Sequence, residues 1–170
     1  MKNETEISVQ CSFTKMVDVT DLIPNPRNPN KHGDKQIAML AKIIRHQGWR
    51  APIVVSKRSG FVVTGHGRLE AAKLLQVQTV PVDFQDFKNE DDERSHLIAD
   101  NRIAEMAEID DNELAKLLEE VGKTELAGFD KEDFAALIAS IEIKTEDDEH
   151  EVQPSGLSKT KTCPHCKKQI

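Results

Sequence analysis

The stretch that decides the fold is residues 64–72, TGHGRLEAA, which follows the short apolar run GFVV at 60–63. The run predicts a strand and the residues after the glycines predict a helix, so a tight turn joins the two. Two glycines let the backbone turn sharply and approach a ligand closely. The first turn of a helix leaves N–H groups unpaired, and the helix dipole at that end favours an anion.

Arg68 adds a forked, charged donor to this turn, and a guanidinium matches the oxygens of a phosphate group. Gly65, Gly67 and Arg68 therefore predict a phosphate cradle, with a surface arginine at a helix start as the alternative. His66 lies in the same turn. Its ordinary pKa near neutrality suits it to contact phosphate or to transfer a proton, while packing or capping of the turn is the other interpretation.

The segments around the turn predict a small mixed α/β core. Apolar runs and helical periodicity predict strands at 15–19, 52–56, 61–63 and 77–84, and helices at 34–47, from the turn to 75, and at 89–107, 111–121 and 131–141. Pro81 suggests that its strand lies at a sheet edge or carries a bulge. The expected fold class is α+β, a small mixed β-sheet with packed helices, followed by a helical appendage and a disordered tail.

Between the first strand and the first helix, residues 22–30 read LIPNPRNPN. Three prolines exclude a helix or a central strand here, which leaves an ordered extended loop or a flexible one. Arg27 and Asn28 in this loop are candidates to close over a nucleotide or to contact DNA. The alternative is a turn rich in asparagine for local hydrogen bonds.

Charge is unevenly distributed along the chain. The formal net charge is −7, but residues 22–75 hold ten Lys or Arg and two Asp or Glu, a formal charge of +8. A basic segment can bind a polyanion even in an acidic chain, because salt screens distant charges beyond about 8–10 Å. We therefore expect this segment to bind a nucleotide or DNA; a solvated helix face is the other interpretation.

Composition points to the cytoplasm. No apolar run approaches the roughly 18 residues of a membrane span, the first residues lack the apolar core of a signal peptide, and the three cysteines do not form an even disulfide framework. Cys163 and Cys166 near the end could supply two ligands of a zinc site. A closed site needs four, so Zn²⁺ would require ligands from elsewhere.

The pattern divides the chain into four parts. Residues 15–108 form the expected nucleotide-binding domain and 109–141 a helical extension. Residues 142–162 show no apolar period and predict a disordered linker, and 163–170 form the Cys-x-x-Cys tail.

The motifs in this order resemble the ParB/sulfiredoxin superfamily, specifically the ParB N-terminal domain, which is also called the ParB-like nuclease domain. The resemblance covers about residues 15–105 and rests on the segments 22–29, 46–48, 52–55, 64–72, 80–82 and 97–101. It implies a nucleoside triphosphate, CTP or ATP, bound with Mg²⁺ and held at Gly65, His66, Gly67 and Arg68. Asp100 and Asn101 resemble the start of the family's Glu-Asn-x-x-Arg motif near metal and phosphates, although Ala104 stands where its arginine would be.

The region after residue 97 is similar to a short branch of the family that is often encoded by phages or mobile elements beside DNA methyltransferases. This resemblance implies a DNA-associated accessory protein with weak NTPase activity, in which Asp100 and His66 are the candidate catalytic residues. It also implies a homodimer. A nuclease or small-molecule phosphotransferase on the same fold is one alternative. A module that docks a DNA methyltransferase is another.

Overall fold

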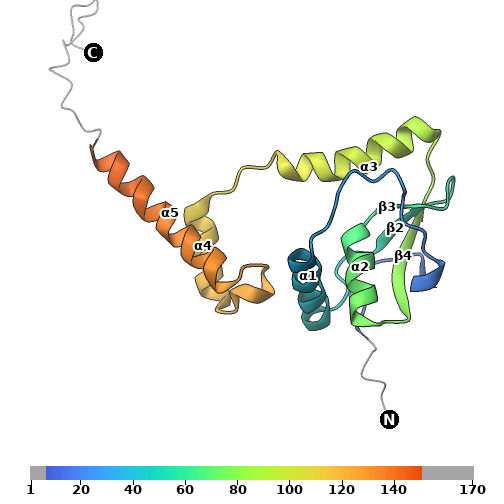
Figure 1. Cartoon of the computed structure of the whole chain (residues 1–170), viewed down its shortest axis with the longest axis horizontal. Coiled ribbons are helices and arrows are strands. Elements are labelled where there is room, and N and C mark those ends of the chain that lie inside the picture. Colours follow the sequence, from blue (N-terminus) through green and yellow to red (C-terminus); the bar gives the residue numbers. More distant parts are fainter. Residues whose placement is uncertain (1–6, 151–170) are drawn as a thin grey trace, which may run out of the picture.

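The computed structural model describes residues 7–150, with side chains as far as residue 142. A four-stranded sheet in the order β1-β4-β2-β3 forms the core of the domain together with α1 (Asp34–Gln47) and α2 (His66–Leu75). Figure 1 shows this core at one end of the molecule. The strands are β1 (Lys15–Asp18), β2 (Ile53–Ser56), β3 (Val62–Thr64) and β4 (Thr79–Gln85). β2 runs parallel to β4, while β1 and β3 run antiparallel to their neighbours, so the expected mixed sheet of an α+β fold is confirmed.

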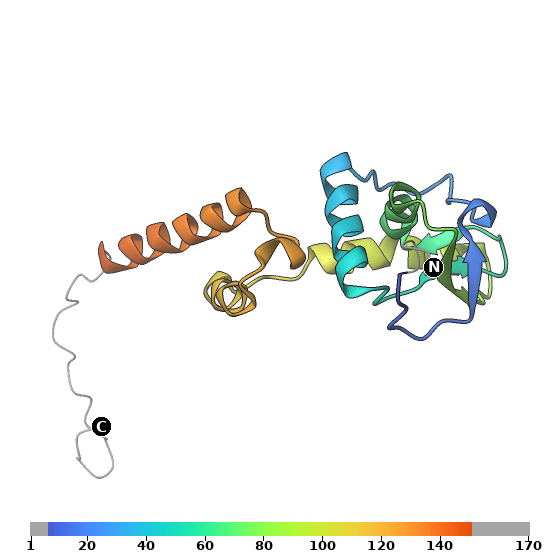
Figure 2. The same ribbon diagram turned by 90° about the horizontal axis from the view of Figure 1, so that it is seen from below.

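Helices cover and extend this sheet. They are α1 (Asp34–Gln47), α2 (His66–Leu75), α3 (Glu90–Glu105), α4 (Asp111–Val121) and α5 (Lys131–His150), with short 3₁₀ turns η1 (Val19–Asp21) and η2 (Thr124–Leu126). α1 packs on α2, α2 lies against the sheet, and α3 passes the edge strand β3. Figure 2 shows that α4 and α5 stand to one side of the core and that α5 points away from it.

The core holds the start of α2 in place. Leu69, Ala71 and Ala72 of α2 are fully buried against sheet residues that include Val62 and Val82. Burying a side chain such as Leu69 contributes about 1.5–3 kcal/mol. The buried face of the helix therefore fixes where the glycine turn before it lies, directly after β3.

Pro81 does not lie in an edge strand, so the edge prediction was wrong. β4 is an inner strand, and Pro81 pairs with Met16 of β1. The carbonyl of Val82 accepts from the Thr14 N–H on the β1 side, so by alternation the missing N–H of Pro81 falls on the β2 side. The ladder with β2 starts only at Val82, so the proline removes no hydrogen bond there.

The last helix is longer than the sequence pattern indicates. A helix end at 141 was predicted from the loss of apolar period, but α5 continues to His150. Residues 142–150 are mostly Glu, Asp and Lys, and a solvated helix needs no apolar stripe, so periodicity cannot detect it. Residues 142–150 of the predicted linker thus fall within α5, and the division of the chain into domain and linker stays a prediction. The rest of that linker, 151–162, and the tail 163–170 lie outside the described residues.

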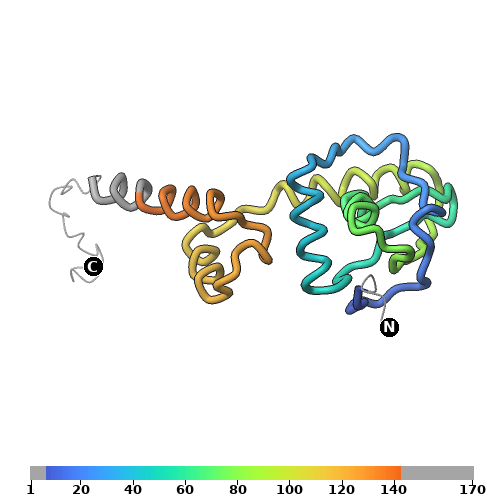
Figure 3. Tube along the Cα trace, turned by 60° about the horizontal axis from the view of Figure 1, so that its bottom comes forward, coloured from blue at the N-terminus to red at the C-terminus, as the bar shows by residue number. Residues whose placement is uncertain are grey.

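The Pro-rich loop, residues 22–30, is ordered along the edge of the sheet. Ile23 bridges Phe61, and the Val62 N–H donates to the Ile23 carbonyl at 2.9 Å. Figure 3 traces this loop beside α3. Pairing with the edge strand settles the choice between an extended and a flexible loop. Within residues 7–150, no helix has the length and apolar character needed to cross a membrane.

Candidate functional site

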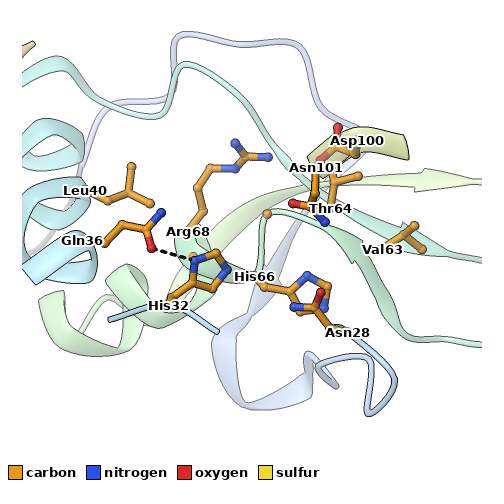
Figure 4. A pocket seen from close by; sticks show the side chains of 12 residues that line it. Asn28, His32, Gln36, Leu40, Val63, Thr64, His66, Arg68, Asp100 and Asn101 are labelled. Carbon is orange, nitrogen blue, oxygen red and sulfur yellow. Dashed lines mark hydrogen bonds between the residues drawn. The ribbon is translucent and has the colours of Figure 1, made fainter. Parts of the chain in front are cut away.

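A cavity of about 160 Å³ opens at the start of α2, and we call it the Arg68 cavity (Figure 4). Four segments meet there: the Pro-rich loop, α1, the glycine turn after β3, and the last part of α3. The predicted site residues that line it are Asn28, Gly65, His66, Gly67, Arg68, Asp100 and Asn101. The fold thus brings together residues up to 73 positions apart in the sequence.

Gly65 makes room for the arginine that follows it. Its φ of 90° and ψ of 25° lie in the left-handed region, which glycine adopts without steric cost. A Cβ on Gly65 would lie 2.9 Å from Nη2 of Arg68, so any side chain would displace the guanidinium. Gly65 therefore serves both the turn and the position of Arg68.

Arg68 carries a buried donor without an acceptor. Among the described residues, its Nε has no hydrogen-bond partner although it is shielded from solvent. Burial lowers the pKa of Arg68, and the negative charge of Asp100 partly opposes that effect. A buried, unsatisfied N–H costs about 1–3 kcal/mol, and an anionic oxygen that reached it would remove this cost.

His66 connects the glycine turn to the Pro-rich loop. Its Nε2 accepts a hydrogen bond from the Asn25 backbone N–H at 3.3 Å. Burial lowers the pKa of His66, and the nearby charge of His32 lowers it further. The ring is therefore held neutral with Nε2 as an acceptor, which leaves Nδ1 as the nitrogen that could meet a ligand.

Asp100 and Asn101 offer oxygens to the cavity from α3. The Nδ2 of Asn101 donates to the Leu97 carbonyl at 3.0 Å, which leaves its Oδ1 as a free acceptor. One carboxylate and one amide oxygen fit Mg²⁺, which usually binds one or two protein oxygens together with waters and phosphate oxygens. Among the described side chains, no group of three His, Cys, Asp or Glu is arranged to hold a metal by itself.

Arg27 does not join the other predicted residues. It lines a separate cavity, although Asn28 beside it lines the Arg68 cavity. The Arg27 backbone N–H donates to Oδ1 of Asn25 at 2.9 Å, which forms an Asx turn. Because the chain turns here, the neighbouring residues Arg27 and Asn28 line different cavities.

Sequence reasoning missed the contribution of α1 and of the strand end. His32, Gln36, Leu40, Val63 and Thr64 also line the Arg68 cavity. Nδ1 of His32 lies 3.1 Å from Oε1 of Gln36, four residues later. The spacing could have suggested this contact, but nothing local shows that α1 faces the glycine turn. Cys163 and Cys166 lie outside the described residues, so their zinc site stays a prediction.

The comparison with protein families agrees with this geometry. The model of the ParB N-terminal domain matches residues 2–101. The chain belongs to the ParB N-terminal domain family. All the residues of the glycine turn, together with Asp100 and Asn101, lie inside the matched segment, so the site described above is part of the family domain.

Two curated relatives and one solved structure extend this finding. The ParB-like nuclease domain-containing protein YnaK of Escherichia coli is 36% identical over 62 residues, 36% of this chain and 70% of that protein. Stage 0 sporulation protein J of Bacillus subtilis is 34% identical over 82 residues, 46% of this chain but only 28% of that protein. The Caulobacter crescentus chromosome-partitioning protein ParB, crystallised with CTP-γ-S, has a TM-score of 0.54 and 22% identity, covering 73% of this chain and 69% of that one, and supports the ParB fold.

Proposed function

We propose that this ParB-type domain binds a nucleoside triphosphate with Mg²⁺ in the Arg68 cavity and serves as a DNA-associated accessory protein. The observation that carries the nucleotide proposal is the buried Nε of Arg68, which has no acceptor among the described residues and lies in a cavity at a helix start. An anion there would gain a charged donor, the free N–H groups of α2 and its dipole together.

Different residues of the cavity would bind the phosphates and the Mg²⁺ of the ligand. Arg68 and the backbone of the glycine turn would hold phosphate oxygens, while Asp100 and Oδ1 of Asn101 would hold Mg²⁺ beside them. A cavity of about 160 Å³ is smaller than the roughly 300–1,000 Å³ of ordinary ligand pockets, so it suits the phosphates and leaves the base outside. CTP is the first candidate because the ParB neighbour was crystallised with a CTP analogue, and ATP is the second.

The test is thermal unfolding of the full chain with CTP, ATP, GTP and UTP in the presence of Mg²⁺. A ligand at one hundred times its Kd adds about 2.7 kcal/mol of stability, which raises Tm by about 5–10 °C for a chain of this size. We expect one nucleotide to produce such a shift in the native protein and none to do so in Arg68→Gln.

Arg45→Gln is the matched control, because it removes the same charge from an exposed position of α1 in the same basic segment. It should keep the full shift. An equal shift in Arg68→Gln would reject the site, and the absence of any shift in the native protein would reject nucleotide binding.

Slow hydrolysis belongs to the same proposal, with Asp100 and His66 as the candidate residues. Both residues line the Arg68 cavity beside the glycine turn. Nδ1 of His66 would have to act, because Nε2 is engaged by Asn25. Phosphate release from the nucleotide identified above, compared between the native protein and Asp100→Asn, tests this step: equal rates would remove Asp100 from it.

The proposed DNA association rests on the +8 charge of residues 22–75. A phage or mobile-element setting, a DNA methyltransferase partner and a homodimer are further parts of the proposal. The exposed apolar side chains of Ile103, Met106 and Ile109 after the core support a protein partner. Light scattering with and without nucleotide tests the homodimer, and co-purification with a methyltransferase encoded beside this chain tests the other partner.

A further inference from the structure

A second cavity of about 80 Å³ lies between the Pro-rich loop, the β2–β3 turn and α3, and we call it the Arg58 cavity. Three arginines line it, each from a different segment. Arg27 comes from the Pro-rich loop, Arg58 from the turn between β2 and β3, and Arg94 from the first half of α3. Several arginines from separate segments around one cavity are a typical feature of sites that bind an anion.

The charges of this cavity are only partly balanced. Arg94 pairs with Glu90 one turn earlier on α3. Arg27 and Arg58 form no ion pair with any residue in the described part of the chain, and both are exposed. Two guanidinium groups therefore remain available to a ligand.

The cavity wall holds three arginines and two carboxylates, Glu90 and Glu93, so its formal charge stays positive at +1. Glu93 is 5% exposed, and its two oxygens accept hydrogen bonds from the Ser56 hydroxyl at 2.8 Å and the Ser59 hydroxyl at 2.5 Å. The Ser56 hydroxyl oxygen in turn accepts a hydrogen bond from the backbone N–H of Arg58 at 3.1 Å. Glu93 thus fixes the turn that carries Arg58, instead of pairing with its guanidinium.

We propose that the Arg58 cavity is a second phosphate-binding site, in which Arg27 and Arg58 hold one phosphate group of a DNA backbone. The cavity is far below the roughly 300 Å³ at the low end of ligand pockets, so it suits a single phosphate group and not a nucleoside. Arginine binds phosphate in a forked geometry, and backbone phosphates provide most contacts in protein–DNA complexes. The source of the phosphate rests on the DNA association proposed above.

The two cavities lie next to each other, because residues of the Pro-rich loop and of α3 line both of them. Leu97 of α3 lines the Arg58 cavity and Asp100 lines the Arg68 cavity, a separation of three residues or about 4.5 Å along the helix axis. In the Pro-rich loop, Asn25 lines the former and Asn28 the latter. A phosphate in the second site would thus lie close to the proposed nucleotide without sharing its ligands.

The experiment measures three ligands against the full chain: a DNA duplex by fluorescence anisotropy over a range of salt concentrations, CTP with Mg²⁺ by calorimetry, and inorganic phosphate by NMR. The variants are Arg27→Gln, Arg58→Gln and the double substitution. Lys116→Gln is the control, because it removes one charge from an exposed position of α4. All positions are on the surface, and thermal unfolding checks that each variant folds.

We expect each arginine variant to lower DNA affinity about tenfold and to reduce the slope of log affinity against log salt by about one, while CTP binding and the control stay unchanged. Unchanged DNA affinity and slope in the double variant would overturn the proposal, as would parallel loss of CTP binding, which would make the cavity part of the nucleotide site. If the native protein binds no DNA but phosphate perturbs Arg27 and Arg58, the phosphate site stands and the DNA association fails. If the binding of DNA and the binding of inorganic phosphate are both unchanged in the arginine variants, the site is rejected, whatever the calorimetry shows for CTP.

Discussion

Arg68 and Gly65 form one unit at the scale of single residues. The guanidinium lies against the glycine turn, with Nη2 only 2.9 Å from where a Cβ of residue 65 would be. Elsewhere in the chain, Gly60 has a similar positive φ of 77° but no atom near its missing Cβ. A substitution at Gly60 therefore measures only the cost of the backbone conformation, whereas one at Gly65 also includes the cost of moving Arg68.

We predict that Gly65→Ala and Gly60→Ala each lose about 1–2 kcal/mol of stability, because both force a left-handed conformation on a residue with a Cβ. Only Gly65→Ala should also lose affinity for nucleotide, since it displaces the guanidinium. Urea unfolding gives the stabilities and calorimetry the affinities. Equal nucleotide affinity in both variants would show that the position of Arg68 is not needed.

His66 predicts a pH dependence near neutrality. Its pKa is lowered in the folded protein by burial, so the unfolded chain binds more protons between the two pKa values. Stability should therefore fall as pH drops from about 6.5, the ordinary value, to the lowered one, and then level off. Protonation also turns Nε2 into a donor and breaks the hydrogen bond from Asn25.

His66→Gln checks this prediction, because an amide cannot titrate in this range. Urea unfolding at pH 7.5 and pH 5.5 should show a smaller difference in stability for the variant than for the native protein. An identical difference would assign the pH dependence to other groups.

At the scale of elements, a buried polar contact fastens α3 to the β2–β3 turn. Glu93 is the only charged side chain among the described residues with so little exposure, and two serine hydroxyls satisfy it. Hydrogen bonds to a buried charge are stronger than ordinary ones, and the loss of one partner leaves the others unsatisfied. This contact sets where α3 runs, and so where Asp100 and Asn101 meet the Arg68 cavity.

Glu93→Ala should cost about 1–3 kcal/mol, since it leaves the buried hydroxyl of Ser56 without its acceptor. Glu120→Ala, at an exposed position of α4, should change stability by less than about 0.5 kcal/mol. Thermal unfolding measures both. A similar small effect at the two positions would mean that the contact does not hold the helix.

The regular elements were largely predictable from sequence, because apolar period and turn residues are local signals. The position of β4 inside the sheet was not, since strand order depends on contacts between distant segments and Pro81 alone points to an edge. The motifs pointed to the glycine turn, Asp100 and Asn101, which line one cavity in the structure, and their roles stay predictions. His32 and Gln36 were missed because their place in the cavity depends on how α1 packs against α2. Arg27 lines another cavity because the path of the Pro-rich loop decides which side chains meet.

At the scale of the whole molecule, ion pairs join the core to residues 109–150, which we call the acidic arm. Lys35 of α1 pairs with Asp130 at 2.7 Å and with Asp133 at 3.6 Å, and Lys42 pairs with Glu125. The formal charge of residues 1–108 is zero, so the whole −7 of the chain lies in residues 109–170. The acidic arm therefore meets the basic α1 at a few exposed ion pairs.

The hydrogen bond from Lys35 lowers the pKa of Asp130 to about 2. A carboxyl with a lowered folded pKa stabilises the fold above its ordinary value, 3.8, and this contribution disappears as pH falls towards 2. Lys35→Gln should raise the pKa of Asp130 towards 3.8, measured by NMR of the carboxyl carbon, and speed amide exchange in residues 124–133. Lys116→Gln should change neither, and an unchanged pKa in Lys35→Gln would rule out the pairing in solution.

The buried Nε of Arg68 has a consequence for how long the protein survives in a cell. A fold that carries an unsatisfied donor is less stable without its anion and recovers that free energy when the anion binds. Proteases degrade the unfolded fraction, so protein turnover should follow the supply of the ligand. The same atom that recognises the ligand would then also set the abundance of the protein.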